Sequence, residues 1–234
     1  VAYDVRTIAN QDTTNEKQIE KIHQLRIGVI GAGNFTKARL LPILKKTGVF
    51  LDTIVSAKGL SSYSAAKKFG FKNNTNDLNN IWSNEEIDTV FITTRHDSHA
   101  SLVIKAIEFD KNVFVEKPLA LTYEELENIQ SAIIRHPSSI LMVGFNRRFA
   151  PHIIKMKTLL DARKQPKSFI FTINAGFIPA DHWVQDLKVG GGRIIGEVCH
   201  FIDLMCYLSG SPINEWSVQS MGNDTLKDKV TINL

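Results

Sequence analysis

Cysteine is scarce in this sequence of 234 residues, which holds only Cys199 and Cys206. Two cysteines cannot form the disulfide framework that small secreted proteins use. If both lie on one helix, they are about 10 Å apart, too far for a disulfide bond. A signal peptide and a long apolar run are also lacking. These absences lead us to expect a cytoplasmic protein that does not bind a membrane.

Dense stripes of basic residues are lacking as well. The formal net charge is +4, but Lys and Arg are scattered and are not interleaved with aromatic residues as in nucleic-acid-binding surfaces. No group of His and Cys has the spacing of zinc ligands. We therefore expect no nucleic acid partner and no metal. Hydrophobic residues make up 43% of the chain, which is enough for a substantial core.

The middle of the chain, residues 25–149, alternates between strand and helix patterns. Its strands are apolar without a polar face, which is typical of a parallel sheet covered by helices on both sides. Thr122 and Glu125 form a predicted capping box at the start of one helix. We predict a Rossmann-type, doubly wound α/β domain with five strands, which lie within residues 25–31, 50–57, 87–94, 112–116 and 139–145.

The two ends of the chain follow other patterns. Residues 1–24 are mostly polar and begin with Val1, which favours a linker or the remnant of a preceding module. Residues 150–234 predict an incomplete α+β second domain. Its last predicted strand is apolar and has no predicted partner, and such an edge favours association. We expect a homo-oligomer formed through this second sheet. Because the second domain is incomplete, we also expect any catalytic activity of the chain alone to be weak. The elements predicted here are a helix in 193–210 and strands in 167–176, 213–221 and 229–234.

A glycine motif joins the first predicted strand to the helix that follows. Gly31 allows a tight turn, and Gly33 allows the backbone to approach a pyrophosphate at the helix N-terminus. The alternative is a plain structural turn, but the strand before and the helix after favour a dinucleotide site. The predicted cofactor contacts in this motif are Gly31, Gly33, Asn34, Phe35 and Thr36.

The end of the second predicted strand lacks the acidic residue that normally reads the ribose of NAD. Ser56 and Lys58 stand there instead. A carboxylate would repel a 2′-phosphate, whereas Ser and Lys tolerate or bind one. The sequence therefore favours NADP over NAD, with NAD as the alternative. Lys58 can also be read as an ordinary exposed lysine.

The fourth predicted strand ends on Glu116, Lys117 and Pro118. In a doubly wound sheet, ligands bind beyond the carboxyl ends of the strands. A lysine held there can donate to a substrate oxygen and stabilise negative charge on it. The alternative interpretation is a surface ion pair at a strand end.

Four segments occur together in this order: GVIGAGNF, VFVEKPLAL, MVGFNRRF and GGGRIIGEVCHFIDL. In this arrangement the chain resembles the Gfo/Idh/MocA family of oxidoreductases from residue 25 to its end. It is most similar to the branch fused behind a zinc-type alcohol dehydrogenase module, which would make the chain a fragment. The resemblance implies a Rossmann domain that binds NAD(P) and a second domain whose open sheet supports a sugar-like substrate.

The resemblance also implies roles for individual residues. Lys117 would contact the nicotinamide ribose and the substrate, and His200 would be the acid/base. Two positions depart from the family pattern, because Gly196 stands where an Asp is usual and Arg95 where a Pro is usual. The implied contacts to the cofactor are Thr93, Thr94, His99, Glu116 and Lys117, and those to the substrate are Asn146, Arg147, Trp183, His200 and Asp203.

His200 and Asp203 lie three positions apart and share one face of the predicted helix. Asp203 could fix the imidazole tautomer that a general base needs, or the pair could be purely structural. Trp183 could stack on a sugar or anchor the core. We predict an NAD(P)-dependent oxidoreductase acting on the CH–OH group of a sugar, polyol or sugar-nucleotide-like alcohol. The alternatives are a dinucleotide-binding module without turnover and NAD-assisted glycoside cleavage.

Overall fold

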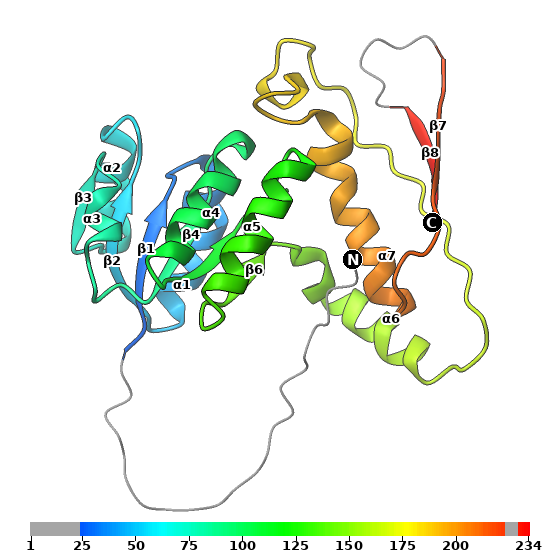
Figure 1. Cartoon of the computed structure of the whole chain (residues 1–234), viewed down its shortest axis with the longest axis horizontal. Helices are drawn as coiled ribbons and strands as arrows, with labels where there is room; N and C mark the ends of the chain where they lie inside the picture. The colour runs from blue at the N-terminus through cyan, green and yellow to red at the C-terminus, as the bar shows by residue number, and fades with distance from the viewer. Residues whose placement is uncertain (1–23, 223–228) are drawn as a thin grey trace, which may run out of the picture.

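The computed structural model describes residues 24–222 and 229–234, so the predicted linker lies outside the described residues except for Gln24 (Figure 1). A parallel six-stranded sheet with strand order β3-β2-β1-β4-β5-β6 forms the first part. This order confirms the predicted Rossmann-type fold. The strands are β1 (Arg26–Ile30), β2 (Phe50–Val55), β3 (Asn73–Thr75), β4 (Thr89–Ile92), β5 (Asn112–Val115) and β6 (Leu141–Val143).

The sheet has one strand more than the five predicted. The sequence of β3 is Asn-Asn-Thr, which is short and polar and therefore lacks the apolar signal of a strand. It lies at the edge of the sheet and pairs only with β2 among the described strands. An edge strand has one neighbour and can remain partly exposed, so polar side chains are tolerated there.

Helices cover both faces of the sheet (Figure 1). One apolar cluster joins α1 and α2 to Ile27 and Val29 of β1, and a second joins α3, α4 and α5 to Ile30 of the same strand. This split follows from the alternation of side chains along a strand. The helices are α1 (Leu41–Lys46), α2 (Leu60–Phe69), α3 (Asn79–Trp82), α4 (His99–Glu108) and α5 (Tyr123–Arg135).

The capping box at the start of α5 is confirmed, since the Thr122 hydroxyl accepts from the Glu125 N–H at 3.1 Å and the Glu125 carboxylate accepts from the Thr122 N–H. The helix that follows the glycine motif is irregular. Its first helical residues, Asn34 and Phe35, lead into a π-helical stretch, η1 (Thr36–Leu40), and the helix continues as α1 with Pro42 at its second position. No helix in the described ranges is long and apolar enough to cross a membrane.

The second part consists of helices and a small hairpin, to the right in Figure 1. Its antiparallel hairpin pairs β7 with β8. The prediction that the last strand has no partner was therefore wrong: β7 is that partner. Neither strand is fully buried, so packing signals in the sequence were weak. The elements are α6 (Pro151–Asp161), a π-helical turn η5 (Ile194–Val198), α7 (Cys199–Ser209), β7 (Ser217–Ser220) and β8 (Val230–Asn233).

The strand predicted in residues 167–176 was also wrong. This stretch is not part of any sheet in the described residues. Its apolar side chains are not buried either, since Ile170 is 91% exposed. A strand requires a neighbour that accepts and donates its backbone hydrogen bonds, and no described strand lies beside this stretch.

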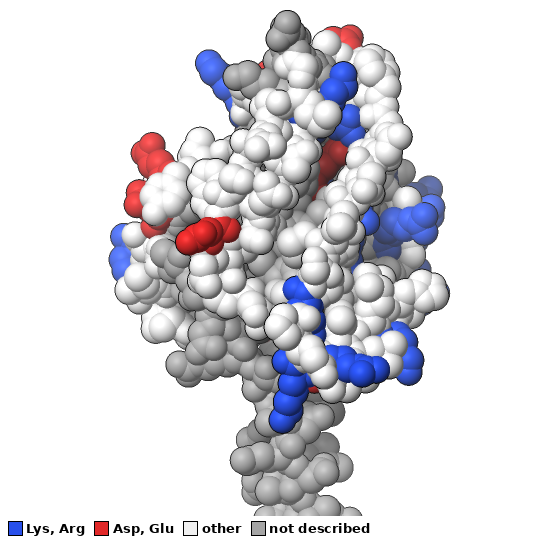
Figure 2. Space-filling model, turned by 90° about the vertical axis from the view of Figure 1, so that its right-hand side faces the viewer, with Lys and Arg blue, Asp and Glu red and all other residues white. Residues whose placement is uncertain are grey.

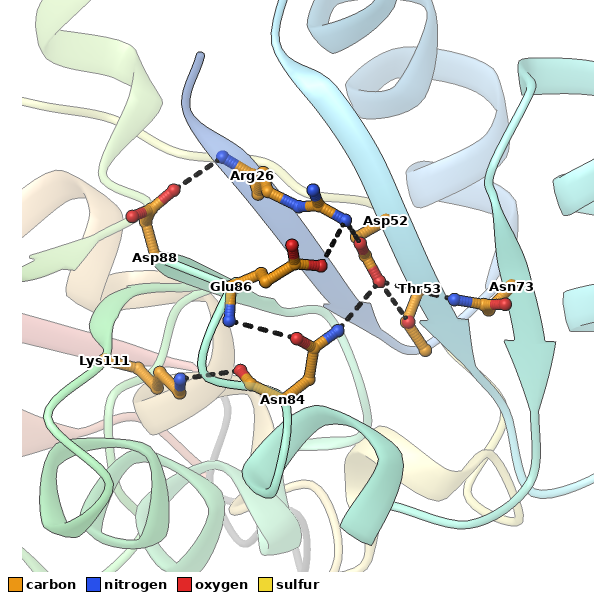
Figure 3. Close-up of polar contacts among 8 residues, drawn as sticks. All are labelled: Arg26, Asp52, Thr53, Asn73, Asn84, Glu86, Asp88 and Lys111. Carbon is orange, nitrogen blue, oxygen red and sulfur yellow. Dashed lines mark hydrogen bonds and ion pairs between the residues drawn. The ribbon is translucent and has the colours of Figure 1, made fainter. Parts of the chain in front are cut away.

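A polar network ties the strands together at their amino ends (Figure 3). The fully buried Asp52 carboxylate accepts from the Arg26 guanidinium, from the Thr53 hydroxyl at 2.7 Å and from the Asn84 amide at 3.2 Å. Burial would raise the pKa of Asp52, but Arg26 and Thr53 hold that pKa below its usual value. Lys111 donates to the Asn84 carbonyl at 2.9 Å. The network fixes this end of the sheet, and the carboxyl ends of the strands lie at the opposite edge.

Candidate active site

The glycine motif lies where β1 and β4 stand side by side and the strand order reverses, which is the usual ligand position in such sheets. Gly31 follows β1 with φ +106°, a conformation that side chains disfavour. A Cβ on Gly31 would come within 2.6 Å of the Thr93 carbonyl oxygen, just after β4. The close approach of these two strand ends therefore requires glycine at position 31.

The other residues of the motif leave space and donors. A Cβ on Gly33 would meet no atom within 4 Å, and Asn34 and Phe35 are exposed. The first N–H groups of a helix have no partner within that helix, and they attract anions. This arrangement fits a pyrophosphate. It also fits the predicted contacts of Gly33, Asn34 and Phe35.

The side chain of Thr36 is used inside the protein. It is buried, and its hydroxyl donates to the Thr93 hydroxyl at 2.8 Å. The Thr93 hydroxyl in turn donates to the Gly31 carbonyl at 3.1 Å. This chain of bonds holds the motif against the end of β4. Contact of both threonines with the cofactor stays a prediction, and their hydroxyl groups already form hydrogen bonds within the protein.

The turn after β2 holds the residues predicted to read the ribose. Ser56 is partly buried, and its hydroxyl accepts from the Ser62 N–H at 3.0 Å. Lys58 is exposed in the turn that precedes α2. Both residues follow the carboxyl end of β2, which pairs with β1, so their position fits the predicted contact with the adenosine ribose. The preference for NADP stays a prediction.

Glu116 and Lys117 follow β5 and are both half-buried, and the Lys117–Pro118 peptide is cis. The Lys117 ammonium donates to the Gly196 carbonyl at 2.6 Å, across to the second part of the chain. Burial raises the pKa of Glu116, which the neighbouring Lys117 partly opposes. The backbone of Gly144 lies against the carboxyl group of Glu116, because a Cβ there would be 3.2 Å from Oε1. These contacts do not describe an exposed ion pair.

His99, in the segment after β4, holds the turn that contains Pro118. His99 is fully buried, with Nδ1 2.7 Å from the Pro118 carbonyl and Nε2 3.3 Å from the Thr94 carbonyl. Burial lowers its pKa, so the ring is neutral at neutral pH. The predicted cofactor role of His99 stays a prediction, and from this position it would act through the turn that it holds. The Thr94 hydroxyl accepts from Ser98 at 2.6 Å.

His200 lies on α7 and is half-buried. Burial, and then the charges of Lys117 and Arg147, lower its pKa to about 4. The Phe145 ring packs edge-on against the His200 imidazole, with the ring centres 6.2 Å apart. The buried Nδ1 of His200 has no hydrogen-bond partner among the described residues.

The prediction that Asp203 orients His200 was wrong. The buried Asp203 carboxylate pairs with Arg148, whose Nε donates to Oδ2 at 2.7 Å and whose Nη2 donates to Oδ1. A guanidinium binds both oxygens of a carboxylate in a planar fork, which an imidazole cannot do. Glu197, the other nearby acid, pairs with Arg193 at 3.0 Å.

Two of the predicted substrate contacts lie in a turn that contacts α7, and a third lies beside His96. Asn146 and Arg147 are exposed in a short 3-10 turn, η3 (Asn146–Phe149), and the Arg147 guanidinium stacks 4.4 Å from the centre of the Phe201 ring. Trp183 is half-buried, with its ring edge-on to His96 at 4.9 Å and below the Arg95 guanidinium at 5.5 Å. The substrate roles of these residues stay predictions.

Two further residues limit the chemistry. Burial raises the pKa of Cys199 to about 11, so its thiol stays protonated and is a poor nucleophile. No cluster of three or more His, Cys, Asp and Glu able to hold a metal occurs among the described residues. What the site offers is an anion cradle, a lysine that donates hydrogen bonds, and a neutral histidine.

The sequence patterns gave His96 no role at the site and did not reveal two contacts there. These are the His96 bond to the Gly190 carbonyl and the Lys117 bond to the Gly196 carbonyl. The run of three glycines at 190–192 was the available signal, because such a run marks close backbone packing. Their partners are about 80 or more positions away in sequence, and only the fold reveals them.

Comparisons with known proteins identify the family of the chain. Residues 25–145 match the Gfo/Idh/MocA family, described as "Oxidoreductase family, NAD-binding Rossmann fold". The scyllo-inositol 2-dehydrogenase (NAD(+)) of Bacillus subtilis is 31% identical over 200 residues, which cover 83% of this chain and 57% of that protein. The levoglucosan dehydrogenase of Pseudarthrobacter phenanthrenivorans is 29% identical over 230 residues, which cover 88% and 59%.

A solved levoglucosan dehydrogenase, in complex with NADH and levoglucosan, has a TM-score of 0.71 and 25% identity, and the match covers 85% of this chain and 57% of that chain. This chain therefore spans less than two thirds of the length of these relatives. The family match alone takes in more than half of the chain. The chain belongs to the Gfo/Idh/MocA family of oxidoreductases.

Proposed function

We propose that this chain binds NAD(P) and carries the acid/base and polarising groups of an oxidoreductase acting on the CH–OH group of a sugar or polyol. The main support is that Lys117, beside the strand ends that also carry the glycine motif, reaches the helical segment that carries His200, because its ammonium donates to the carbonyl of Gly196, four residues before His200. Lys117 comes from the Rossmann part and His200 from α7, and the charge of the first lowers the pKa of the second.

The residues at the switch point would hold the cofactor. The open space at Gly33 and the helix N–H groups suit the pyrophosphate, and the turn with Ser56 and Lys58 suits the adenosine ribose. The nicotinamide would accept or give the hydride, and the protein supplies orientation and electrostatics. The names of two relatives mention NAD(+) and NADH, whereas Lys58 favours NADP, so both cofactors belong in any test.

Lys117 would polarise the reacting oxygen. Its ammonium has three N–H groups, of which one donates to Gly196. The other two can donate to the oxygen of the substrate and stabilise the negative charge that develops when its proton leaves. In the oxidation, His200 would accept the proton of the substrate hydroxyl, and a bound nicotinamide would supply the hydride acceptor for the carbon that carries this hydroxyl.

His200 is uncharged at neutral pH and can accept that proton. A general base works best, however, with a pKa near the working pH. The pKa of His200, about 4, is well below neutral pH. Asp203, which could have raised the pKa, is bound to Arg148. These observations favour a second candidate, a dinucleotide-binding module that turns over slowly or not at all. Glycoside cleavage with bound NAD stays an alternative without a specific contact in its favour.

The names of the relatives support the proposed substrate class. Two are named for scyllo-inositol and levoglucosan, a cyclic polyol and a sugar derivative with several hydroxyl groups. The polar side chains of Asn146 and Arg147, in the turn that contacts α7, and the aromatic ring of Trp183, beside His96, suit a substrate of this kind. The resemblance to the branch fused to a zinc-type alcohol dehydrogenase module stays a prediction.

We also propose that the chain self-associates through its second part. Figure 2 shows this side of the molecule, with few charged side chains in its centre. Several large apolar residues are exposed in the second part, among them Trp216 at 73%, Phe177 at 87% and Met221 at 61%. Large exposed apolar side chains that gather into a patch mark interaction surfaces, and we propose that these side chains do so.

The direct test of the function is an assay with scyllo-inositol, myo-inositol and levoglucosan, each with NAD and with NADP, following reduced nicotinamide. Lys117→Met keeps the length of the side chain but cannot donate, and it should lower turnover by about 100-fold or more. His200→Asn should act in the same direction. If the chain binds the cofactor but neither variant changes a measurable rate, the assigned roles are wrong. Binding without any turnover would favour the second candidate.

A further inference from the structure

Two buried histidines from one short segment hold both sides of the candidate site. The segment, residues 95–99, follows β4. His99 Nδ1 lies 2.7 Å from the Pro118 carbonyl, and His96 Nδ1 lies 2.8 Å from the Gly190 carbonyl. A carbonyl oxygen only accepts, so His96 donates Nδ1–H to Gly190. Nε2 of His99 lies 3.3 Å from the Thr94 carbonyl, and the shorter contact at Nδ1 assigns the single hydrogen of the neutral ring to the bond with Pro118. The two rings are neighbours, with centres 5.7 Å apart.

The chain held by His96 is a glycine strap, which we define as residues 189–196. The Asp97 N–H also binds this strap, at the Val189 carbonyl, at 3.1 Å. A Cβ on Gly190 would come within 2.4 Å of the Val184 backbone, and one on Gly191 within 2.6 Å of the Leu121 side chain. The strap therefore fills a space in which these positions accept only glycine.

The far end of the strap binds Lys117. Gly196 lies in the π-helical turn η5, and its carbonyl accepts from the Lys117 ammonium at 2.6 Å. A Cβ on Gly196 would be 3.2 Å from Cε1 of His96. The His96 ring therefore lies against the residue whose carbonyl binds the lysine. His99 holds the backbone of the same lysine from the other side, through Pro118.

We propose that His96 is a positioning residue for Lys117. By binding Gly190 and packing on Gly196, it fixes the carbonyl that orients the ammonium and leaves two N–H groups for a substrate oxygen. The consequence for turnover rests on the proposed function, but the positioning itself does not. A small displacement of a polarising group can lower a rate by about 100-fold.

The test compares His96→Asn with His96→Leu in the full 234-residue chain. Asn carries an N–H that can replace Nδ1–H, whereas Leu is similar in bulk and cannot donate. Proton–nitrogen correlation spectra of lysine ammonium groups report directly on Lys117, whose signal is identified by its loss in Lys117→Arg. We expect a protected signal in the wild type and in His96→Asn. In His96→Leu the signal should exchange as fast as that of an exposed lysine.

A folded His96→Leu protein that keeps the protected Lys117 signal would overturn the proposal. If His96→Leu fails to fold, Gly196→Ala decides. Its methyl group would lie against Cε1 of His96, so the protected signal should be lost. The double variant with His96→Asn, which removes that atom, should recover it. An unchanged signal in Gly196→Ala alone, or no recovery in the double variant, would contradict the proposal.

Turnover separates this inference from the proposed function. If the chain is active, His96→Leu should lower kcat by about 10-fold to 100-fold with a smaller change in KM, and His96→Asn should restore most of the rate. If the lysine signals behave as expected while no variant shows any turnover, the positioning role holds and the proposed reaction does not.

Discussion

At the scale of single residues, Gly31 and Gly33 share one motif but differ in what they require. Gly31 has φ +106° and no space for a Cβ, whereas Gly33 faces open space. We expect Gly31→Ala to lower the free energy of unfolding by at least about 2 kcal/mol, because it combines backbone strain with a collision. Gly33→Ala should change it by less than about 0.5 kcal/mol. Urea unfolding measures both, and equal effects would contradict the geometry at Gly31.

The buried histidines predict how stability depends on pH. Burial lowers the pKa values of His96, His99 and His200, the last to about 4. The unfolded chain, with histidine pKa values near about 6.5, therefore binds more protons than the folded chain between those limits. The free energy of unfolding should fall as the pH falls from about 6.5 to about 4. Glu116, whose pKa is raised, opposes this trend with one group against three.

The control for this pH dependence is His200→Asn, which removes one of the three titrating imidazoles. Its free energy of unfolding should fall less steeply between about pH 6.5 and about pH 4 than that of the wild type. Identical slopes in the two proteins would mean that His200 does not titrate with a lowered pKa in the folded state.

At the scale of elements, the Arg148–Asp203 pair joins the turn after β6 to α7, which carries His200. The Asp203 side chain is 6% exposed and that of Arg148 is 30% exposed. We expect Asp203→Ala to cost about 2–4 kcal/mol, because it leaves a partly buried guanidinium without its partner. The matched control is Glu197→Ala, because the Glu197 side chain is 30% exposed and its partner Arg193 keeps a hydrogen bond to the Gly176 carbonyl at 2.8 Å. The loss of this pair should cost less than about 1 kcal/mol.

Far-UV circular dichroism with thermal unfolding checks this difference. A result in which Glu197→Ala costs as much as Asp203→Ala would show that burial does not set the strength of these pairs. If the folded Asp203→Ala protein also turns over more slowly than the wild type, we attribute the loss to a displacement of α7, which carries His200.

Local elements could be predicted from the sequence, and elements that depend on distant partners could not. The capping box at Thr122, the glycine turn at Gly31 and the strand end at Lys117 rest on neighbouring residues, so the pattern was sufficient. Asp203 was assigned to His200 because helical spacing is visible in the sequence, whereas Arg148 is 55 positions away. The sequence did not predict the polar edge strand β3, and it wrongly predicted a strand in residues 167–176. The reason is the same in both cases, because pairing with a distant strand decides whether a stretch forms a strand.

At the scale of the whole molecule, the second part should drive self-association. Trp216→Ser with Met221→Ser removes two exposed apolar side chains there, and Leu60→Ser with Tyr63→Ser removes two from α2 of the Rossmann part. Light scattering over a range of concentrations should show association of the wild type and of the α2 variant, and less in the first variant. A wild type that stays monomeric at all concentrations would contradict the proposal.

We propose that the turn after β2 determines which of the two cofactors the whole molecule binds. Lys58 is exposed, and no acid stands at the end of β2. We expect NADPH to bind more tightly than NADH, and Lys58→Ala to weaken NADPH by about 10-fold while leaving NADH almost unchanged. A clear preference for NADH in the wild type would show that the lysine does not read the phosphate.

The central claim is that a dinucleotide binds where β1 and β4 meet, with its pyrophosphate against the glycine motif. Calorimetric titration of NADH and NADPH into the 234-residue chain and into Gly33→Leu tests it most directly. We predict saturable binding to the wild type and none to Gly33→Leu, whose side chain would fill the open space while the protein stays folded. No binding to the wild type, or unchanged affinity in a folded Gly33→Leu protein, would contradict the account.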